Sequence, residues 1–348
     1  MTTLTTIEQA IAALPKAELH LHLEGSVSPE TASLLSARHG AAIPPERVAE
    51  RYKHSDFIGF IEVFKWVTSH LQSPQDYALI THRLADELVR QKVVYAEITL
   101  SVGVMLRKGQ DVDANLAAMK EVADRYESLK GLKIRWIFDA ARQFGAKAAM
   151  EVAHRAARLQ SAGVVAFGMG GDELAFPAAD FRAAFDFARQ QGLHVVVHAG
   201  EIGKPDSVRD AIDLLGAERI GHGIATSLDP ALMDRLAATR IVLENCLTSN
   251  LRTGALAQQS GKPNASLKDH PLPKFLGKGV EVTLATDDPA LFETDLLTEY
   301  SRALSLGLEP PQVVRLIETG FQAAFLTPEE KRGLLTALRT ELKSSGLV

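Results

Sequence analysis

The chain has 348 residues, a formal net charge of -5 at pH 7 and one cysteine, Cys246. Charges of both signs are mixed along it, so the basic stripe that nucleic-acid binding needs is absent, and one cysteine excludes an intrachain disulfide or a zinc site built on paired cysteines. No apolar run approaches the roughly 20 residues of a membrane helix, and the N-terminus lacks a charged segment followed by an apolar run, so we expect a soluble cytoplasmic protein without a signal peptide.

After a short amphipathic helix over residues 5–14, the stretch 18–25 reads Glu-Leu-His-Leu-His-Leu-Glu-Gly. Alternation of polar and apolar residues is typical of a strand, and it places His20 and His22 on one side with the leucines on the other. Two histidines at positions i and i+2 can share one metal ion, whereas a lone histidine is more often a core or surface residue. The metal hypothesis therefore depends on ligands from distant parts of the chain.

Helices are expected after this strand. Ser28-Pro29-Glu30 is typical of a helix start, and that helix should end near Gly40. Residues 44–71 are expected to form a helical insertion with four aromatic residues partly on one face. These four are Phe57, Phe60, Phe64 and Trp66. Two interpretations remain open, namely packing of the helix against the body of the protein or a lid over an apolar part of a ligand.

From residue 76 onward, helical and apolar segments alternate regularly. Helices are expected over residues 76–91, 112–129, 146–161 and 177–191. Apolar runs typical of buried strands cover residues 93–99, 133–139, 164–168, 193–198, 219–222, 240–244 and 280–287. With the opening strand they make eight strands, and no repeat or linker divides the chain. The pattern predicts one α/β domain over residues 1–348, a (β/α)8 TIM barrel with a helical insertion after the first strand.

The C-terminal ends of these strands carry chemically active side chains, and active sites of such barrels lie at that end. Each side chain alone has an ordinary explanation, such as a core histidine, a helix cap or a turn. Together they place histidines and carboxylates around one rim, which we interpret as a functional site. The residues concerned are His22, Gly171, Asp172, Glu173, His198, Glu201, His222, Glu244, Asn245, Asp287 and Asp288.

The side chains at this rim fit zinc, because three imidazoles and one carboxylate leave one position for water. Magnesium would want fewer histidines. A second metal would need a bridging carboxylate or modified lysine, and the intermediate strands end in Thr99, Asp139 and Gly168 with no lysine among them. We therefore expect one zinc ion per chain. Its predicted ligands are His20, His22, His198 and Asp287.

Five motifs, in this order, make the chain resemble the adenosine deaminase family. They are PKAELHLHLEG at 15–25, GDE at 171–173, HAGE at 198–201, RIGHG at 219–223 and TDDP at 286–289. Any one of them is modestly specific, but the ordered set is very specific. The resemblance implies a zinc-dependent barrel hydrolase that replaces the 6-amino group of an adenine ring by oxygen and releases ammonia.

The resemblance also implies roles for single residues. Zinc would supply hydroxide at neutral pH, with Asp288 holding it and bonding the purine N7 and His222 orienting it and stabilising its charge. Glu201 would deliver a proton to N1, which requires a desolvated carboxyl with a raised pKa. The backbone N–H of Gly171 would bond N3, where the missing side chain permits close approach. His22 is also expected to contact the substrate.

Glu24 is expected to face the same cavity as the histidines, because it follows His22 by two residues. It would then help to select the 5′ group of the substrate, since the family's nucleoside enzymes usually have an aspartate there that bonds the ribose 5′ hydroxyl. The alternative is that Glu24 caps the following turn through backbone N–H groups.

The substrate remains open, because the family includes enzymes for adenosine, adenine and 6-aminodeoxyfutalosine, an adenine nucleoside with a bulky 5′ extension used in one menaquinone route. Adenine-specific members commonly have glutamate at the position of Glu24 but depart from the GDE pattern. We expect adenosine or a 5′-modified adenosine, with 6-aminodeoxyfutalosine or adenine as alternatives. An inactive zinc-binding homologue is disfavoured, because Glu201, His222 and Asp288 are all present.

Overall fold

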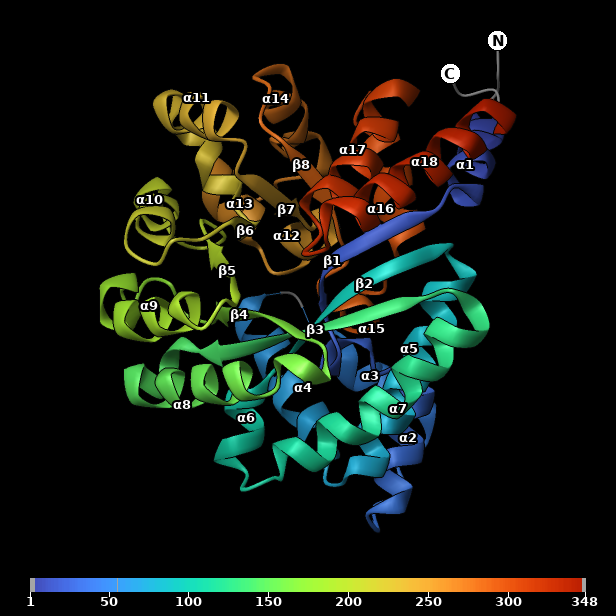
Figure 1. Ribbon diagram of the computed structural model, residues 1–348, viewed down its shortest axis with the longest axis vertical. Helices are drawn as coiled ribbons and strands as arrows, with labels where there is room; N and C mark the ends of the chain where they lie inside the picture. Colours follow the sequence, from blue (N-terminus) through green and yellow to red (C-terminus); the bar gives the residue numbers. More distant parts are fainter. Residues whose placement is uncertain (1–3, 55, 346–348) are drawn as a thin grey trace.

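The centre of the computed structural model, which describes residues 4–54 and 56–345, is a sheet of eight parallel strands (Figure 1). Hydrogen-bonded neighbours follow the order of the chain from the first strand to the eighth. The strands are β1 (Lys16–His22), β2 (Val93–Leu100), β3 (Lys133–Ala141), β4 (Val164–Gly170), β5 (His194–Ala199), β6 (Arg219–His222), β7 (Val242–Asn245) and β8 (Val282–Leu284).

The first and last strands meet just beyond the short β8. The backbone N–H of His22 donates to the Asp287 carbonyl at 2.7 Å, and the Asp287 N–H donates to the His20 carbonyl at 3.0 Å. Leu21 and Asp287 form a parallel bridge there. These contacts nearly close the barrel, and the prediction of a TIM-barrel fold is confirmed.

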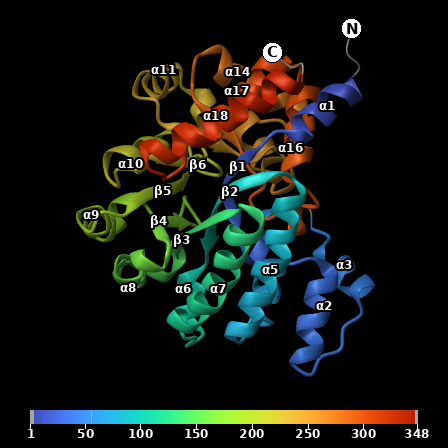
Figure 2. The same ribbon diagram turned by 45° about the vertical axis from the view of Figure 1, so that its right-hand side comes forward.

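Helices surround the strands (Figures 1 and 2). Those inserted after β1 are α2 (Pro29–Arg38), α3 (Pro45–Tyr52), α4 (Phe57–Ser69) and α5 (Pro74–Arg90), preceded by the 3-10 turn η1 (Glu24–Ser26). The others are α1 (Leu4–Ala13), α6 (Val102–Arg107), α7 (Val112–Lys130), α8 (Gly145–Arg158), α9 (Arg182–Gln190), α10 (Pro205–Asp213), α11 (Pro230–Thr239), α12 (Leu247–Arg252), α13 (Ala255–Ser260), α14 (Leu272–Gly277), α15 (Pro289–Phe292), α16 (Leu296–Ser305), α17 (Pro310–Ala323) and α18 (Pro328–Ser345).

Local sequence explains where the inserted helices begin. The Ser28 hydroxyl accepts the Thr31 N–H at 3.3 Å before α2, which is the cap expected of serine before proline. The segment 44–71 is helical as predicted but divides into α3 and α4. The second helix starts separately because the Asp56 carboxylate accepts the Gly59 N–H at 2.8 Å.

The alternation predicted for the first strand is present in the core. Leu19, Leu21 and Leu23 are fully buried and belong to the main apolar cluster, which α17 helps to form by packing against β1. Burial of one such side chain is worth about 1.5–3 kcal/mol. A shift of one residue would turn the leucines toward the polar interior of the barrel and the histidines into the apolar layer, so this packing also sets the direction of His20 and His22.

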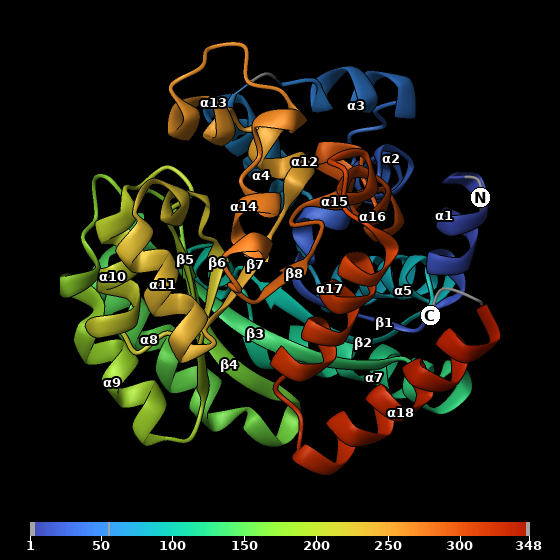
Figure 3. The same ribbon diagram turned by 90° about the horizontal axis from the view of Figure 1, so that it is seen from above.

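The two ends of the barrel are covered by different helices (Figure 3). Helices α4, α12, α13 and α15 gather on one side, where the chain leaves the strands, and α18 lies on the opposite side. Helix α4 contacts both η1 and α15, so the insertion reaches the end of the barrel that carries the histidines. Among the described residues, none of the helices is both long and apolar enough to cross a membrane.

Candidate metal and catalytic site

Four predicted metal ligands from three parts of the barrel come together. The Nε2 atom of His22 lies 3.3 Å from Nε2 of His198 and 3.3 Å from Oδ1 of Asp287. The Nε2 atom of His20 lies 3.4 Å from the same Oδ1. Each residue offers one donor atom, and these atoms all lie within 4.8 Å of one another. The group lies where β1, β5 and β8 end.

These donor atoms fit a metal ion. Nε2 of His20 is buried without a hydrogen-bond partner, whereas buried polar atoms normally have one. Donors at about 2.0–2.1 Å from a tetrahedral zinc lie roughly 3.3–3.4 Å apart, which agrees with the observed spacings. Burial lowers the pKa of His22 to about 4 and the pKa of His198 well below its usual value. Both rings are therefore neutral, as metal ligation requires. Burial would lower the pKa of His20 as well, but Asp287 and Glu244 outweigh it and raise that pKa to about 10, so a bound ion would replace the proton on this ring.

Buried groups behind the ligands hold them in place. Nδ1 of His20 lies 2.8 Å from Oε2 of Glu244, whose other oxygen accepts from Arg219 Nε at 2.6 Å. The Ser249 hydroxyl donates to Oδ2 of Asp287 at 2.7 Å. Burial alone would raise the pKa of Glu244, but the Arg219 charge and the His20 hydrogen bond outweigh it and lower that pKa. The carboxylate therefore orients His20 through its second nitrogen.

Glu201 lies beside the ligands on the loop after β5. The Glu173 carboxylate accepts the backbone N–H groups of Gly200 at 2.6 Å, Glu201 at 3.0 Å and Ile202 at 3.1 Å, so it fixes this loop. Burial and the charges of Asp287 and Glu173 raise the pKa of Glu201 well above its usual value. This raised pKa favours the protonated form, which is the form that can donate a proton.

Asp288 and His222 complete the inner end of the site. Oδ1 of Asp288 is buried without a partner, and a Cβ atom at Gly25 would lie 1.8 Å from it, so only glycine leaves room there. Nε2 of His222 lies 3.6 Å from Oε2 of Glu201 and 3.8 Å from Oδ2 of Asp287. His222 and Asp287 both have positive φ, at 61° and 65°, a strained conformation often found at functional sites.

A cavity of about 530 Å³ connects these groups to the outside. Gly171 lines it with φ 104°, a conformation that residues with side chains rarely adopt, so this position also favours glycine. Asp139, at the β3 end, lines the cavity with Oδ1 unpartnered, and burial raises its pKa to about 7. The cationic residues that line the cavity are Lys65, Arg107 and Lys108.

The aromatic residues of the insertion divide between two surroundings. Phe57, Phe60 and Phe64 of α4 line the cavity, and Phe60 also stacks on Phe292 with ring centroids 4.9 Å apart. Trp66 instead packs against Tyr52, with centroids 6.3 Å apart. Helix α4 therefore packs against the body of the protein and also forms an apolar wall of the cavity.

Glu24 lies beside the site rather than in the cavity wall. Because β1 ends at His22, Glu24 belongs to η1, and strand alternation does not reach it. Its Oε1 accepts the Ser101 N–H at 3.0 Å, and its Oε2 is buried without a partner. Burial raises the pKa of Glu24 to about 7. Among the described residues that line the cavity, Glu24 is not included.

Sequence reasoning assigned no role to several residues that support this site. Glu173 stands in the GDE motif and Glu244 at the end of a strand, so their positions in the sequence could have indicated a supporting role. Ser249 and Asn250 follow β7 in α12, where no spacing distinguishes them. Their contacts with Asp287 and with Nδ1 of His222, at 2.7 and 3.0 Å, depend on the fold alone.

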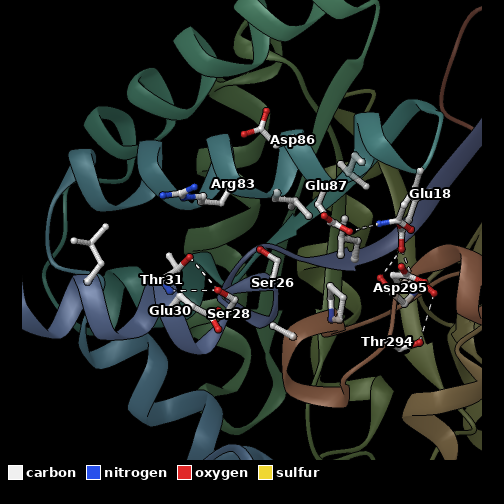
Figure 4. Close-up of a pocket in the computed structure, with 18 residues that line it drawn as sticks. Glu18, Ser26, Ser28, Glu30, Thr31, Arg83, Asp86, Glu87, Thr294 and Asp295 are labelled. Atoms are coloured by element: carbon white, nitrogen blue, oxygen red, sulfur yellow. Dashed lines mark hydrogen bonds between the residues drawn. The ribbon is translucent and has the colours of Figure 1, made fainter. Parts of the chain in front are cut away.

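A second cavity of about 520 Å³ lies on the outer side of β1 (Figure 4). In this view Arg83 and Glu87 of α5 lie above it, while Thr31 of α2 and Asp295 lie below, at opposite ends. Glu18 borders it and accepts the Thr286 N–H at 3.0 Å, which anchors the segment before the metal ligands. None of the predicted site residues lines this cavity.

Comparison with known proteins agrees with this arrangement. The model of the adenosine deaminase family matches residues 15–341. The aminodeoxyfutalosine deaminase of Streptomyces coelicolor is 39% identical, over 95% of this chain and 85% of that protein. An adenine deaminase of Rhizobium leguminosarum bv. trifolii is 33% identical, over 93% and 99%. The crystal structure of adenine deaminase from Arthrobacter aurescens superposes with a TM-score of 0.88 at 27% identity, over 95% and 100%.

Proposed function

The chain belongs to the adenosine deaminase family, and from this premise we propose that it is a zinc-dependent hydrolase of an adenine-containing nucleoside. It would replace the 6-amino group by oxygen and release ammonia. The observation that carries this proposal is that four metal-ligand side chains meet beside Glu201, a buried carboxyl with a raised pKa, at one end of a cavity. The proposed ligands of one zinc ion are His20, His22, His198 and Asp287.

Zinc, when bound, would supply a Lewis acid that makes water a nucleophile at neutral pH. The protein positions that water: Asp288 accepts a hydrogen bond from it, and His222 stabilises the charge on its oxygen. Both side chains are buried, so their interactions with a charged oxygen are stronger than they would be in water.

Proton delivery to the ring is the task we assign to Glu201. When the water oxygen bonds to C6, the electron pair of the C6–N1 double bond moves to N1, which takes the proton of Glu201. The water supplies two protons: one goes to the amino group, which leaves as ammonia when the C6–N bond breaks, and the other returns to Glu201, so the 6-oxo ring remains. The Glu173 carboxylate holds the Glu201 backbone, so the acid is positioned before the substrate arrives.

Two observations favour a nucleoside with a 5′ extension over free adenine. Besides the proposed metal ligands, the cavity is lined by the phenylalanines of α4 and by Lys65, Arg107 and Lys108, which offer apolar and cationic contacts beyond a purine ring. A relative that is 39% identical acts, by its name, on aminodeoxyfutalosine. We therefore place 6-aminodeoxyfutalosine first among the substrates, before adenosine and adenine.

The test is a comparison of kcat/KM for these three compounds with zinc-loaded protein, measured by ammonia release. We expect deamination of at least one nucleoside, with 6-aminodeoxyfutalosine preferred over adenosine. Preference for free adenine would contradict the nucleoside proposal. No ammonia from any of the three, with zinc bound, would support the alternative of an inactive zinc-binding homologue.

A further inference from the structure

We propose that Asn250 and His270 are positioning residues that fix the tautomer of His222, so that its Nε2 carries the hydrogen and faces the reaction site as a donor. The relay begins at a backbone N–H and passes through two buried side chains. It deepens the role given to His222 in the proposed function, but the tautomer itself can be measured without substrate.

The tautomer of His270 is fixed by a backbone N–H group, which can only donate a hydrogen bond. The backbone N–H of Leu272, the first residue of α14, donates to Nδ1 of His270 at 3.1 Å. The first N–H groups of a helix have no partner within it and need an acceptor, so Nδ1 of His270 carries no hydrogen. Burial lowers the pKa of His270 to about 3. The ring is therefore neutral, and its single hydrogen lies on Nε2.

The second step orients the amide of Asn250. Nε2 of His270 lies 3.3 Å from Oδ1 of Asn250, and the N–H there needs an acceptor. The amide oxygen must therefore face His270, which turns the amide nitrogen toward His222. That nitrogen lies 3.0 Å from Nδ1 of His222. Because an amide nitrogen donates and does not accept, Nδ1 of His222 carries no hydrogen.

The hydrogen of His222 is thus on Nε2, at the face turned toward the site. This nitrogen lies 3.6 Å from Oε2 of Glu201 and 3.8 Å from Oδ2 of Asp287. In this form His222 donates a hydrogen bond to the attacking oxygen and does not remove its proton.

Asn250 and His270 act through His222 rather than on a substrate. Asn250 is fully buried and His270 is 3% exposed, and neither lines the cavity. The backbone of His222 is held separately, because Asn245 Nδ2 donates to its carbonyl at 2.6 Å. Changes at positions 250 and 270 should therefore alter the imidazole hydrogen while the peptide at 222 stays in place.

The test is nitrogen NMR of histidine side chains in the full-length protein, metal-free and zinc-loaded, because protonated and unprotonated ring nitrogens have different chemical shifts. For wild-type His222 we expect an unprotonated Nδ1 and a protonated Nε2. Asn250→Asp is nearly isosteric but offers only acceptors, so the hydrogen should move to Nδ1. In zinc-loaded Asn250→Asp, kcat should fall about 10²-fold or more with KM little changed, the pattern of an interaction made in the transition state.

Two variants at position 270 distinguish a role of His270 in positioning His222 from a role in packing alone. His270→Phe fills the space but removes the donor to Asn250, so both tautomers of His222 should be populated and kcat should fall. His270→Gln can return an N–H near the position of Nε2 and should largely restore the wild-type signals and kcat. His154→Phe, at an exposed position on α8, serves as the control for spectrum and activity.

Either of two results would overturn the proposal. One is a wild-type His222 with its hydrogen on Nδ1, which needs no variant and so does not depend on how the variants fold. The other is a folded Asn250→Asp protein whose His222 signals match the wild type. Failure of the proposed function is a separate result, because absence of ammonia release would leave the NMR assignment unaffected.

Discussion

At the scale of single residues, the protonation state of Glu201 is decided by its surroundings. Burial, Asp287 and Glu173 all raise the pKa of this carboxyl, and the proposed chemistry uses its proton. Activity should therefore be lost as pH rises through the Glu201 pKa, because only the protonated form can donate. A pH profile of kcat/KM should show this basic limb.

Glu201→Gln provides the direct test of the acid. Glutamine keeps the size and hydrogen bonding of the side chain but has no transferable proton, so kcat should fall by roughly 10²–10⁴-fold. Zinc content should not change, because Glu201 is not one of the proposed ligands. Glu151→Gln, at an exposed position on α8, is the matched control. Near-normal turnover of Glu201→Gln with zinc in place would show that another group protonates N1.

Glu24 combines a structural contact with an unused oxygen. Its Oε1 accepts the Ser101 N–H, while Oε2 is buried without a partner. A ribose or 5′ group could bond this oxygen only if the turn after β1 moved to bring it to the cavity. Glu24→Asp withdraws that oxygen by one methylene, so relative kcat/KM should shift toward adenosine by about tenfold or more. Parallel assays on adenosine, adenine and 6-aminodeoxyfutalosine measure the shift. Equal changes for all three would show that Glu24 only supports the loop.

At the scale of elements, β7 supports a ligand that belongs to β1. Glu244 on β7 bonds His20 and Arg219. Glu244→Gln would replace one carboxylate oxygen by an amide nitrogen and remove a charge, so zinc affinity should weaken by about 10–100-fold. Competition with a chelator measures the affinity.

Glu281→Gln is the matched control for this change. Glu281 directly precedes β8, is 8% exposed and pairs with Arg315 at 3.1 Å, so it is a comparable carboxylate away from the proposed metal site. Zinc affinity should stay at the wild-type value in this variant. If Glu244→Gln were folded and bound zinc as tightly as Glu281→Gln, the role of Glu244 in orienting His20 would be refuted.

Elements with strict periodicity were predictable, and contacts between elements were not. Alternation around His20 and His22 indicated both the strand and the shared face, because a strand repeats every two residues whatever surrounds it. The same rule failed to place Glu24, since the strand stops at His22 and the turn after it follows another geometry. The hydrogen bond between Asn250 and His270 joins α12 to the segment before α14. No local sequence pattern predicts a contact between segments that are apart in the chain.

At the scale of the whole molecule, the proposed zinc ligands join distant parts of the barrel. His20 and His22 belong to β1 and His198 to β5, and Asp287 follows β8. These four residues are far apart in the unfolded chain, so a metal ion has a much higher affinity for the folded chain. Metal binding should therefore stabilise the fold as well as supply chemistry.

The purified protein should thus carry about one zinc per chain and lose thermal stability when it is removed. Free zinc at about 1,000 times Kd would add roughly 4 kcal/mol to the free energy of unfolding, which for a chain of this size corresponds to a rise in Tm of about 5–8 °C. Metal analysis and thermal melts with and without a chelator measure both quantities. His198→Ala lacks one ligand, so its Tm should respond much less to zinc. Two zinc ions per chain would contradict the mononuclear site, and full activity after exhaustive chelation would contradict the metal mechanism itself.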